Sequence, residues 1–287
     1  HQKNAMRHLI SLKEQSADDI REILDMAAIL KKKYKAGEVT NLLPNKTLIM
    51  LFQKNSTRTR LSFEAGMTEL GGHAIFLAAS HAQLPLADFR DEIRAVMRFG
   101  DVLMMRPMRV EDAQTAASFD RIPVIDGCSE KYHPCQALGD ILTMAEYSGG
   151  LENIKKIAWI GIENNVSNTL MLASAKLGIK VALAAPEAHP ASVAAELNAQ
   201  AEGTGNVERV QQRIGGMSRH QRSPLHAKVA PDGAHEDAIP DLGHAVIGAI
   251  DQLMLDVVEQ SDVASGAPLA KQAGPVSPPI LFAFWRD

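Results

Sequence analysis

Cysteine and aromatic residues are scarce in this 287-residue sequence, and each scarcity excludes a class of protein. The two cysteines, Cys128 and Cys135, are too few for a disulfide scaffold and do not form the Cys-x-x-Cys pairs of zinc sites. Aromatic residues make up 5% of the chain, so its core must be built from aliphatic side chains and the 12 methionines. Hydrophobic and charged residues, at 46% and 22%, are close to globular averages, which excludes disordered, collagen-like and coiled-coil proteins.

The sequence also lacks long apolar runs and an excess of basic charge. No apolar run approaches the roughly 18 residues that a membrane-spanning helix needs, and no signal-peptide pattern opens the sequence. The 30 Lys and Arg residues are outnumbered by 34 Asp and Glu residues, which argues against a general nucleic-acid-binding protein. We therefore expect a soluble, cytoplasmic globular protein that binds neither nucleic acid nor membrane.

The spacing of apolar residues predicts an α/β fold in which strands and helices alternate. Ser16 is a good N-cap for a first helix. Strands are expected at residues 47–52, 73–77, 101–106, 122–125, 157–160 and 181–184, with later helices at 89–99, 110–118, 133–147, 165–177 and 192–201. Apolar strands that alternate with helices through short turns indicate parallel sheets covered on both faces. We therefore expect two domains, each a parallel sheet flanked by helices.

A glycine pair at residues 149–150 marks the expected hinge between the two domains. The first domain would span residues 1–148 and the second 149–287. The second domain is atypical after about residue 203, where half of the 14 prolines lie and where no buried strand is expected. One further helix is predicted at residues 244–260.

The segment Ser56-Thr57-Arg58-Thr59-Arg60 directly follows the strand at 47–52 and begins a helix. In an open parallel sheet, ligands bind at the carboxyl ends of strands, where the positive ends of helices also point. Three hydroxyl groups, the free amides of a first helical turn and a guanidinium suit a phosphate dianion. The alternative is a hydroxyl-capped helix with exposed arginines.

Two further segments fall at the same edge of the predicted sheet. Arg106 ends the strand at 101–106, where a lone arginine is otherwise a surface residue. His133-Pro134-Cys135-Gln136 opens a helix, and its His and Gln offer a hydrogen-bond donor and an orienting amide to a carbonyl group. His133 is alternatively a structural residue. Some of the arginines between residues 58 and 109 must simply solvate helices, but a pocket that draws on several of them would attract a small anion: Arg58, Arg60, Arg90, Arg94, Arg98, Arg106 and Arg109.

These segments together resemble the aspartate/ornithine carbamoyltransferase family over roughly residues 7–200. The family pattern Ser-Thr-Arg-Thr-Arg followed by Ser-Phe-Glu is found at 56–60 and 62–64, and His-Pro-x-Gln at 133–136. The segment 129–140, Ser-Glu-Lys-Tyr-His-Pro-Cys-Gln-Ala-Leu-Gly-Asp, is similar to the ornithine branch. So is the Asn164-Asn165 pair, whose alternative interpretation is helix capping.

The resemblance implies transfer of a carbamoyl group from carbamoyl phosphate to the δ-amine of ornithine, as in arginine biosynthesis, without a metal or organic cofactor. The residues implied to bind carbamoyl phosphate are Ser56, Thr57, Arg58, Thr59, Arg106, His133, Gln136 and, from a neighbouring subunit, Gln83. Of these, Arg106, His133 and Thr59 would be catalytic, because they would stabilise the charge that develops on the carbonyl oxygen. Asn165 would contact the amino-acid substrate. The Gln83 loop implies a homotrimer or a multiple of trimers.

The second half of the sequence departs from the ornithine branch. The Asp-x-Trp-x-Ser-Met-Gly and His-Cys-Leu-Pro segments of that branch are missing, and Ile162 and Glu163 replace its Asp-Gly. Either the sequence after about residue 203 diverged to serve another substrate, or its reading frame was altered. The alternatives to ornithine transfer are a carbamoyltransferase for another amine and a catalytically silent homologue that binds carbamoyl phosphate.

Overall fold

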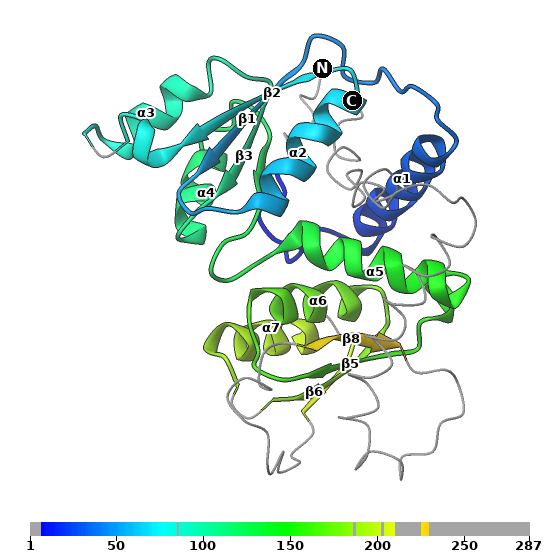
Figure 1. Ribbon diagram of the computed structural model, residues 1–287. Coiled ribbons are helices and arrows are strands. Elements are labelled where there is room, and N and C mark those ends of the chain that lie inside the picture. Colours follow the sequence, from blue (N-terminus) through cyan, green and yellow to red (C-terminus); the bar gives the residue numbers. More distant parts are fainter. Residues whose placement is uncertain (1–6, 85, 186–187, 202–203, 210–224, 230–287) are drawn as a thin grey trace, which may run out of the picture. The chain divides into compact units, whose positions relative to one another are not determined.

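The computed structural model describes residues 7–84, 86–185, 188–201, 204–209 and 225–229 (Figure 1). The expected first domain contains α1 (Ala17–Lys35), β1 (Thr47–Phe52), α2 (Thr57–Glu69), β2 (His73–Ala78), the 3-10 turn η1 (Ala79–His81), α3 (Phe89–Val96), β3 (Val102–Arg106), α4 (Val110–Ala117), β4 (Val124–Asp126) and α5 (Pro134–Ser148). It is followed by the 3-10 turn η2 (Leu151–Asn153), β5 (Lys156–Ile160), α6 (Asn165–Lys176), β6 (Lys180–Ala184), α7 (Pro190–Ala201), β7 (Val207–Arg209) and β8 (Leu225–Val229). None of the described helices is long and apolar enough to cross a membrane.

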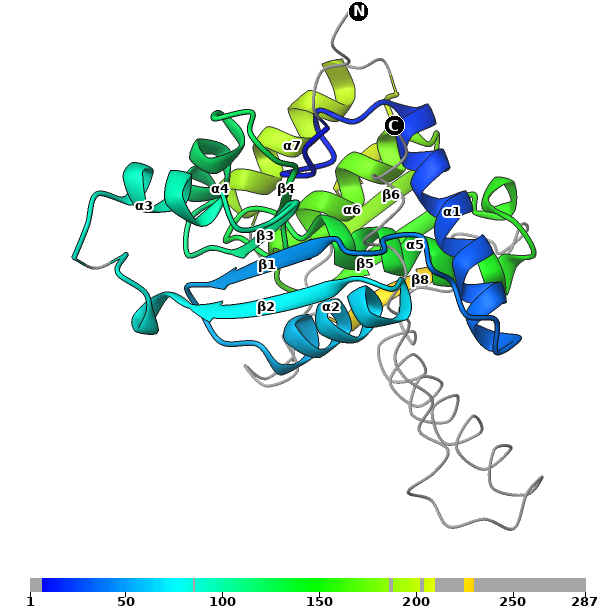
Figure 2. The ribbon, with the colours of Figure 1, turned by 90° about the horizontal axis from the view of Figure 1, so that it is seen from above.

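The first sheet has the strand order β2-β1-β3-β4, and all its pairs are parallel. The central strands β1 and β3 are buried almost throughout, as expected of strands covered on both faces. Figure 2 shows β1 and β2 side by side with α2 alongside them. In the β1–β3 register Phe52 lies opposite Arg106, so the last residues of both strands meet at one edge. This edge carries the predicted site.

The second sheet has the order β7-β6-β5-β8. Strands β5, β6 and β7 are parallel, whereas β8 pairs antiparallel with β5. The α/β fold class is confirmed, although the antiparallel β8 makes the second sheet mixed and not wholly parallel as expected. Two strands follow residue 203, where no buried strand was expected, and β7 is buried only at its first residue. Val207 in β7 is 8% exposed, and its strand is too short to give a period of its own. The helix predicted at 244–260 lies outside the described residues.

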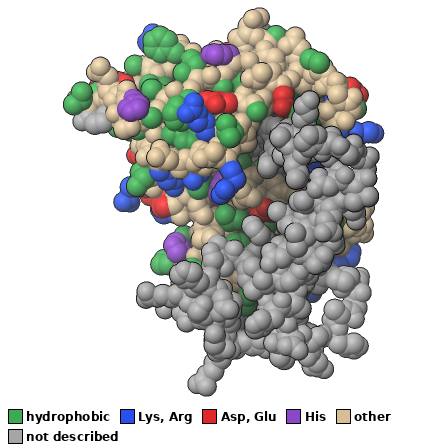
Figure 3. Space-filling view, viewed as in Figure 1, with side chains coloured by type: hydrophobic (Ala, Val, Ile, Leu, Met, Phe, Trp, Pro, Cys, Tyr) green, Lys and Arg blue, Asp and Glu red, His purple; other side chains and the backbone are tan. Residues whose placement is uncertain are grey.

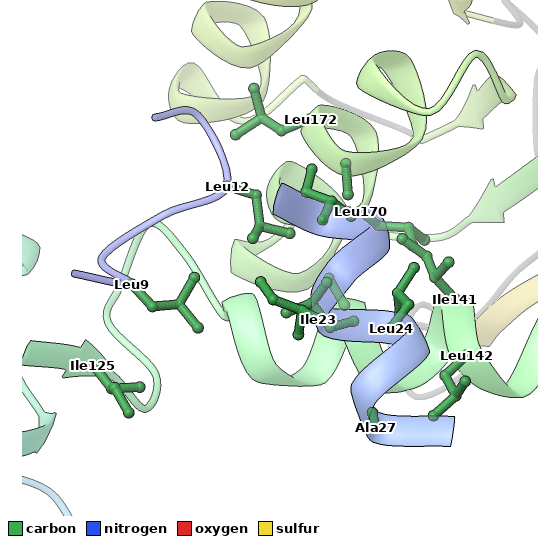
Figure 4. Close-up of a cluster of buried hydrophobic side chains, with 14 of the residues drawn as sticks. Leu9, Leu12, Ile23, Leu24, Ala27, Ile125, Ile141, Leu142, Leu170 and Leu172 are labelled. Atoms are coloured by element: carbon green, nitrogen blue, oxygen red, sulfur yellow. The ribbon is translucent and has the colours of Figure 1, made fainter. Parts of the chain in front are cut away.

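The helices α1, α5 and α6 share one hydrophobic cluster (Figure 4). Ser16 begins α1 with a capping box, in which its side chain accepts from the Asp19 amide and the Asp19 carboxylate accepts from the Ser16 amide. Apolar residues at helical spacing then form the buried side of α1: Ile20, Ile23, Leu24, Ala27 and Leu30. The helix α5 ends at Ser148, where Gly149 has a φ of 72° that glycine adopts without strain. The domain boundary at 148 stays a prediction.

Candidate functional site

Ser56 begins α2 directly after β1. Its Oγ accepts a hydrogen bond from the backbone N–H of Thr59 at 3.3 Å and donates to the Thr59 Oγ1 at 3.0 Å. Thr57 and Arg58 are exposed in the same first turn. Unpaired backbone amides and the positive end of the helix dipole therefore lie at the strand ends. The segment is a capped helix, as the alternative interpretation held, and its first turn also has the groups that an anion requires.

Arg106 joins this turn from the neighbouring strand. Its Nη1 donates to the Thr59 Oγ1 at 3.0 Å, so Ser56, Thr59 and Arg106 form one hydrogen-bonded chain. The Arg106 Nε is buried and has no hydrogen-bond partner among the described residues. A guanidinium keeps its charge at any physiological pH and presents several donors in a fixed plane. Arg106 thus supplies a fixed positive charge with an unused buried donor.

His133 is the N-cap residue of α5, and Pro134 follows at the first helical position. Its backbone N–H donates to the Thr169 Oγ1 at 2.9 Å, while its side-chain Nδ1 is buried and unpartnered within the described residues. Burial and, to a lesser extent, the charges of Arg106 and Lys54 lower the pKa of His133 to about 4. The imidazole is therefore neutral at pH 7, with one N–H donor available.

The two predicted glutamines lie apart from the hydrogen bonds that join Thr59 to Arg106. Gln136 is exposed, and its Nε2 donates to the Asp140 Oδ1 at 2.9 Å, one turn along α5. Gln83 is exposed after η1, and its carbonyl oxygen accepts from the backbone of Leu86 at 2.9 Å. Neither side chain is hydrogen-bonded to Thr59 or to Arg106 in the part of the chain that the structure describes. Their roles stay predictions.

Asn165 has a structural contact of its own. Its Nδ2 donates to the Ser129 carbonyl oxygen at 2.7 Å and approaches the Cys128 Sγ at 3.2 Å. Its neighbour Asn164 caps α6, with its Oδ1 accepting from the amides of residues 166 and 167, as the capping interpretation held. Asn165 therefore fixes the loop that leads to His133, and contact with an amino-acid substrate stays a prediction for it.

Two charged residues at this edge were missed from the sequence: Lys54 and Asp126. Lys54 lies in the turn between β1 and α2, and its charge acts on both Asp126 and His133. Asp126 ends β4 with 0% exposure, and burial raises the pKa of its carboxyl group to about 7. An acidic residue directly after the apolar stretch 122–125 was the available signal, since a carboxylate at a strand end faces the ligand edge.

Several of the seven arginines between residues 58 and 109 have partners outside the candidate site. The Arg60 guanidinium lies 3.8 Å from the centre of the Phe76 ring, and its Nε donates to the carboxylate one turn later. Arg90 and Arg94 both lie over the ring of Phe119, at 4.9 and 4.6 Å. Figure 3 shows Lys and Arg side chains at several separate places on the visible face. Arg60, Arg90 and Arg94 are therefore among the arginines that cover helix surfaces, as expected of part of the set.

The fold and the strand-end groups define an α/β protein with a candidate oxyanion site at the carboxyl edge of its first sheet. Residues 7–146 match the family model described as aspartate/ornithine carbamoyltransferase, carbamoyl-P binding domain. The ornithine carbamoyltransferase of Archaeoglobus fulgidus is 36% identical over 239 residues, which are 83% of this chain and 74% of that protein. The chain belongs to the aspartate/ornithine carbamoyltransferase family.

Other relatives match a smaller share of their own length. The ornithine carbamoyltransferase of Carboxydothermus hydrogenoformans is 40% identical over 197 residues, 68% of this chain and 63% of that protein. The solved structure of ornithine carbamoyltransferase from Pyrococcus furiosus superimposes with a TM-score of 0.66 at 41% identity, covering 72% of this chain and 67% of that one. The chain thus spans a little under two thirds of the length of several curated relatives that it matches.

Proposed function

We propose that this protein is an ornithine carbamoyltransferase, which moves the carbamoyl group of carbamoyl phosphate to the δ-amine of ornithine and releases citrulline and phosphate. The observation that carries the proposal is the hydrogen bond from Arg106 to Thr59 beside the neutral imidazole of His133. A cation, a helix start and a neutral N–H donor at one strand edge match the parts of carbamoyl phosphate. The names of the relatives point to the same activity.

The geometry suggests a role for each group. The phosphate is held by the first turn of α2, with Ser56, Thr57, Arg58 and Thr59. The neutral amine of ornithine attacks the carbamoyl carbon, the new C–N bond forms, the C–O bond to phosphate breaks and the amine nitrogen gives up a proton. Negative charge that builds on the carbonyl oxygen is stabilised by Arg106, an oxyanion-hole role worth about 3–4 kcal/mol for a well-placed donor.

His133 serves the same carbonyl oxygen as a neutral donor, because its pKa of about 4 keeps it unprotonated at working pH. The proposal further includes orientation of the carbamoyl nitrogen by Gln136, contact of Asn165 with the amino acid, and Gln83 from a neighbouring subunit. A contribution of Gln83 to the site of a neighbouring subunit implies a homotrimer. We also propose that the enzyme is cytoplasmic and acts in arginine biosynthesis.

A second candidate is a carbamoyltransferase for a different amine. It is favoured by Glu163, which stands where the ornithine branch has Asp-Gly and whose buried carboxylate pairs with Arg209 at the end of β7. Arg209 also contacts Glu196 of α7 at 2.7 Å. These charges lie after β5, at the carboxyl edge of the second sheet, where the amine would bind.

The test is an assay of citrulline formation, with a panel of other amines, combined with titration of carbamoyl phosphate binding. Arg106→Ala and Arg58→Ala should abolish binding, whereas Arg21→Ala, an exposed arginine of α1, should leave it unchanged. Unchanged affinity in Arg106→Ala would refute the site. Product with another amine alone would favour the second candidate, and binding without any turnover would favour a silent homologue. A monomer in sedimentation would contradict the trimer.

A further inference from the structure

Asp126 is a buried carboxyl group at the ligand edge for which neither the motifs nor the mechanism above has a use. It is the last residue of β4, and its side chain is completely shielded from solvent. Its Oδ1 accepts a hydrogen bond from the backbone N–H of Cys128 at 2.9 Å, whereas its Oδ2 is without a partner among the described residues. A buried carboxylate oxygen without a donor is costly, which favours its protonated form.

Asp126 lies at the same strand edge as the candidate anion site. In the β3–β4 register it lies opposite Met105, the residue before Arg106, and the amide of Gly127 donates to the Met105 carbonyl oxygen at 2.7 Å. Lys54, two residues before Ser56, acts electrostatically on both Asp126 and His133. The charge of one lysine thus acts on Asp126 and on His133 together.

The other groups that surround Asp126 differ in how they act on its charge. Lys54 from the β1–α2 turn favours the carboxylate, as does the Ser129 hydroxyl, whereas the charge of Glu130 opposes it. On α5, burial together with Asp126 and Cys128 raises the pKa of the Cys135 thiol to about 12, so this thiol is neutral near pH 7. His133 is neutral as well. Asp126 therefore changes its charge near neutrality, whereas Cys135 and His133 do not.

We propose that Asp126 is a proton-linked group of the anion site, which takes up a proton from solvent when a dianion binds at the start of α2, so that anion affinity falls as the pH rises through neutrality. The inference rests on the proposed carbamoyl phosphate site. A dianion placed near a carboxylate disfavours the ionised form of that carboxylate. By linkage, the protonated form of Asp126 must then bind the dianion more tightly.

The size of the effect follows from linkage. The carboxyl group is half ionised at about pH 7 in the free protein. If the bound dianion raises this midpoint by about one further unit, the dissociation constant should increase about five-fold between about pH 6 and about pH 8. The charge of His133 does not contribute in this interval, because its midpoint lies near pH 4.

Sulfate is a suitable probe, because it stays a dianion throughout the neutral pH range, so its own titration adds nothing. Its binding to the full chain is measured by calorimetry at about pH 6, 7 and 8, each in two buffers of different ionisation enthalpy. The wild-type protein should take up a fraction of a proton on binding near pH 7.5. Asp126→Asn, which keeps an acceptor for the Cys128 N–H but cannot ionise, should lose that uptake and bind with an affinity that changes less than about two-fold.

Asp120→Asn is the matched control. Asp120 precedes β4, at the opposite end of the strand, is exposed, and has a φ of 47°, which asparagine tolerates. This control should keep the wild-type pH dependence. Wild-type binding without proton uptake, or uptake that persists in Asp126→Asn, would overturn the inference alone. If wild-type protein binds neither sulfate nor carbamoyl phosphate, the proposed function fails and the inference with it.

Discussion

Replacing Asp126 by asparagine should stabilise the protein, and should do so more at high pH than at low pH. The carboxyl group lies in an environment that opposes its charge, because burial outweighs the favourable action of Lys54 and Ser129. Its pKa is raised from 3.8 to about 7 in the folded chain. Between these two values the folded state binds more protons than the unfolded state, so stability must fall as the pH rises.

The magnitude follows from the same shift. Each pKa unit is worth about 1.4 kcal/mol, so a group displaced from 3.8 to about 7 destabilises the fully ionised folded state by about 4 kcal/mol. The contribution is negligible below about pH 3, reaches about 2 kcal/mol near pH 5 and is complete above about pH 8. Asp126→Asn removes it, so the gain in stability should be about 2–3 kcal/mol larger at pH 8 than at pH 5.

The assay is urea unfolding followed by circular dichroism, at both pH values, for wild-type protein, Asp126→Asn and the control Asp25→Asn, which alters an exposed residue of α1. The comparison between pH values cancels any change in packing or hydrogen bonding that the amide brings, because those terms do not titrate. Asp25→Asn should show the same pH dependence as wild-type protein. A gain in Asp126→Asn that is equal at the two pH values would refute the reasoning, because it would mean that the buried carboxyl group does not titrate between them.

Two further changes separate structural from catalytic roles. Arg209→Met should lower the free energy of unfolding by about 3 kcal/mol in urea titrations, because the buried Glu163 carboxylate loses its counter-ion, and adding Glu163→Gln should restore most of it. His133→Gln should lower the rate of citrulline formation while leaving the shape of its pH profile between about pH 5.5 and 8 unchanged, because the imidazole is already neutral there. Loss in the variant of an ionisation that the wild-type profile shows in this interval would contradict the depressed pKa of His133.

The first sheet could be predicted from the sequence because each of its strands has a local signal. Strands such as β1 are continuous apolar runs bounded by turns, and Ser16 and Ser56 mark helix starts with hydroxyl caps that the structure contains. The second sheet was predicted less completely. The strand β7 has three residues, too few to show alternation, and β8 joins β5 from far along the chain. Such long-range antiparallel pairing leaves no periodic mark in a local window.

The candidate site was only partly visible for a similar reason. Thr59, Arg106 and His133 each stand at the end of a predicted strand or the start of a predicted helix, so topology alone brings them to one edge. Asp126 and Lys54 stand at the same edge, but nothing local shows that one is fully buried and that the other faces it. Burial of a single polar side chain depends on the distant segments that pack over it, so no local sequence pattern predicts it.

The loop between β4 and α5 depends on residues that follow it by more than thirty positions. Asn165 holds the Ser129 carbonyl oxygen, Asn168 holds that of Lys131 at 3.0 Å, and the Thr169 hydroxyl accepts the His133 amide. All three lie in the first turns of α6. The position of the imidazole is therefore set by α6, although every motif for carbamoyl phosphate lies before residue 148. Asn165 need not touch a substrate to matter for catalysis, because it fixes the loop that carries His133, the neutral donor.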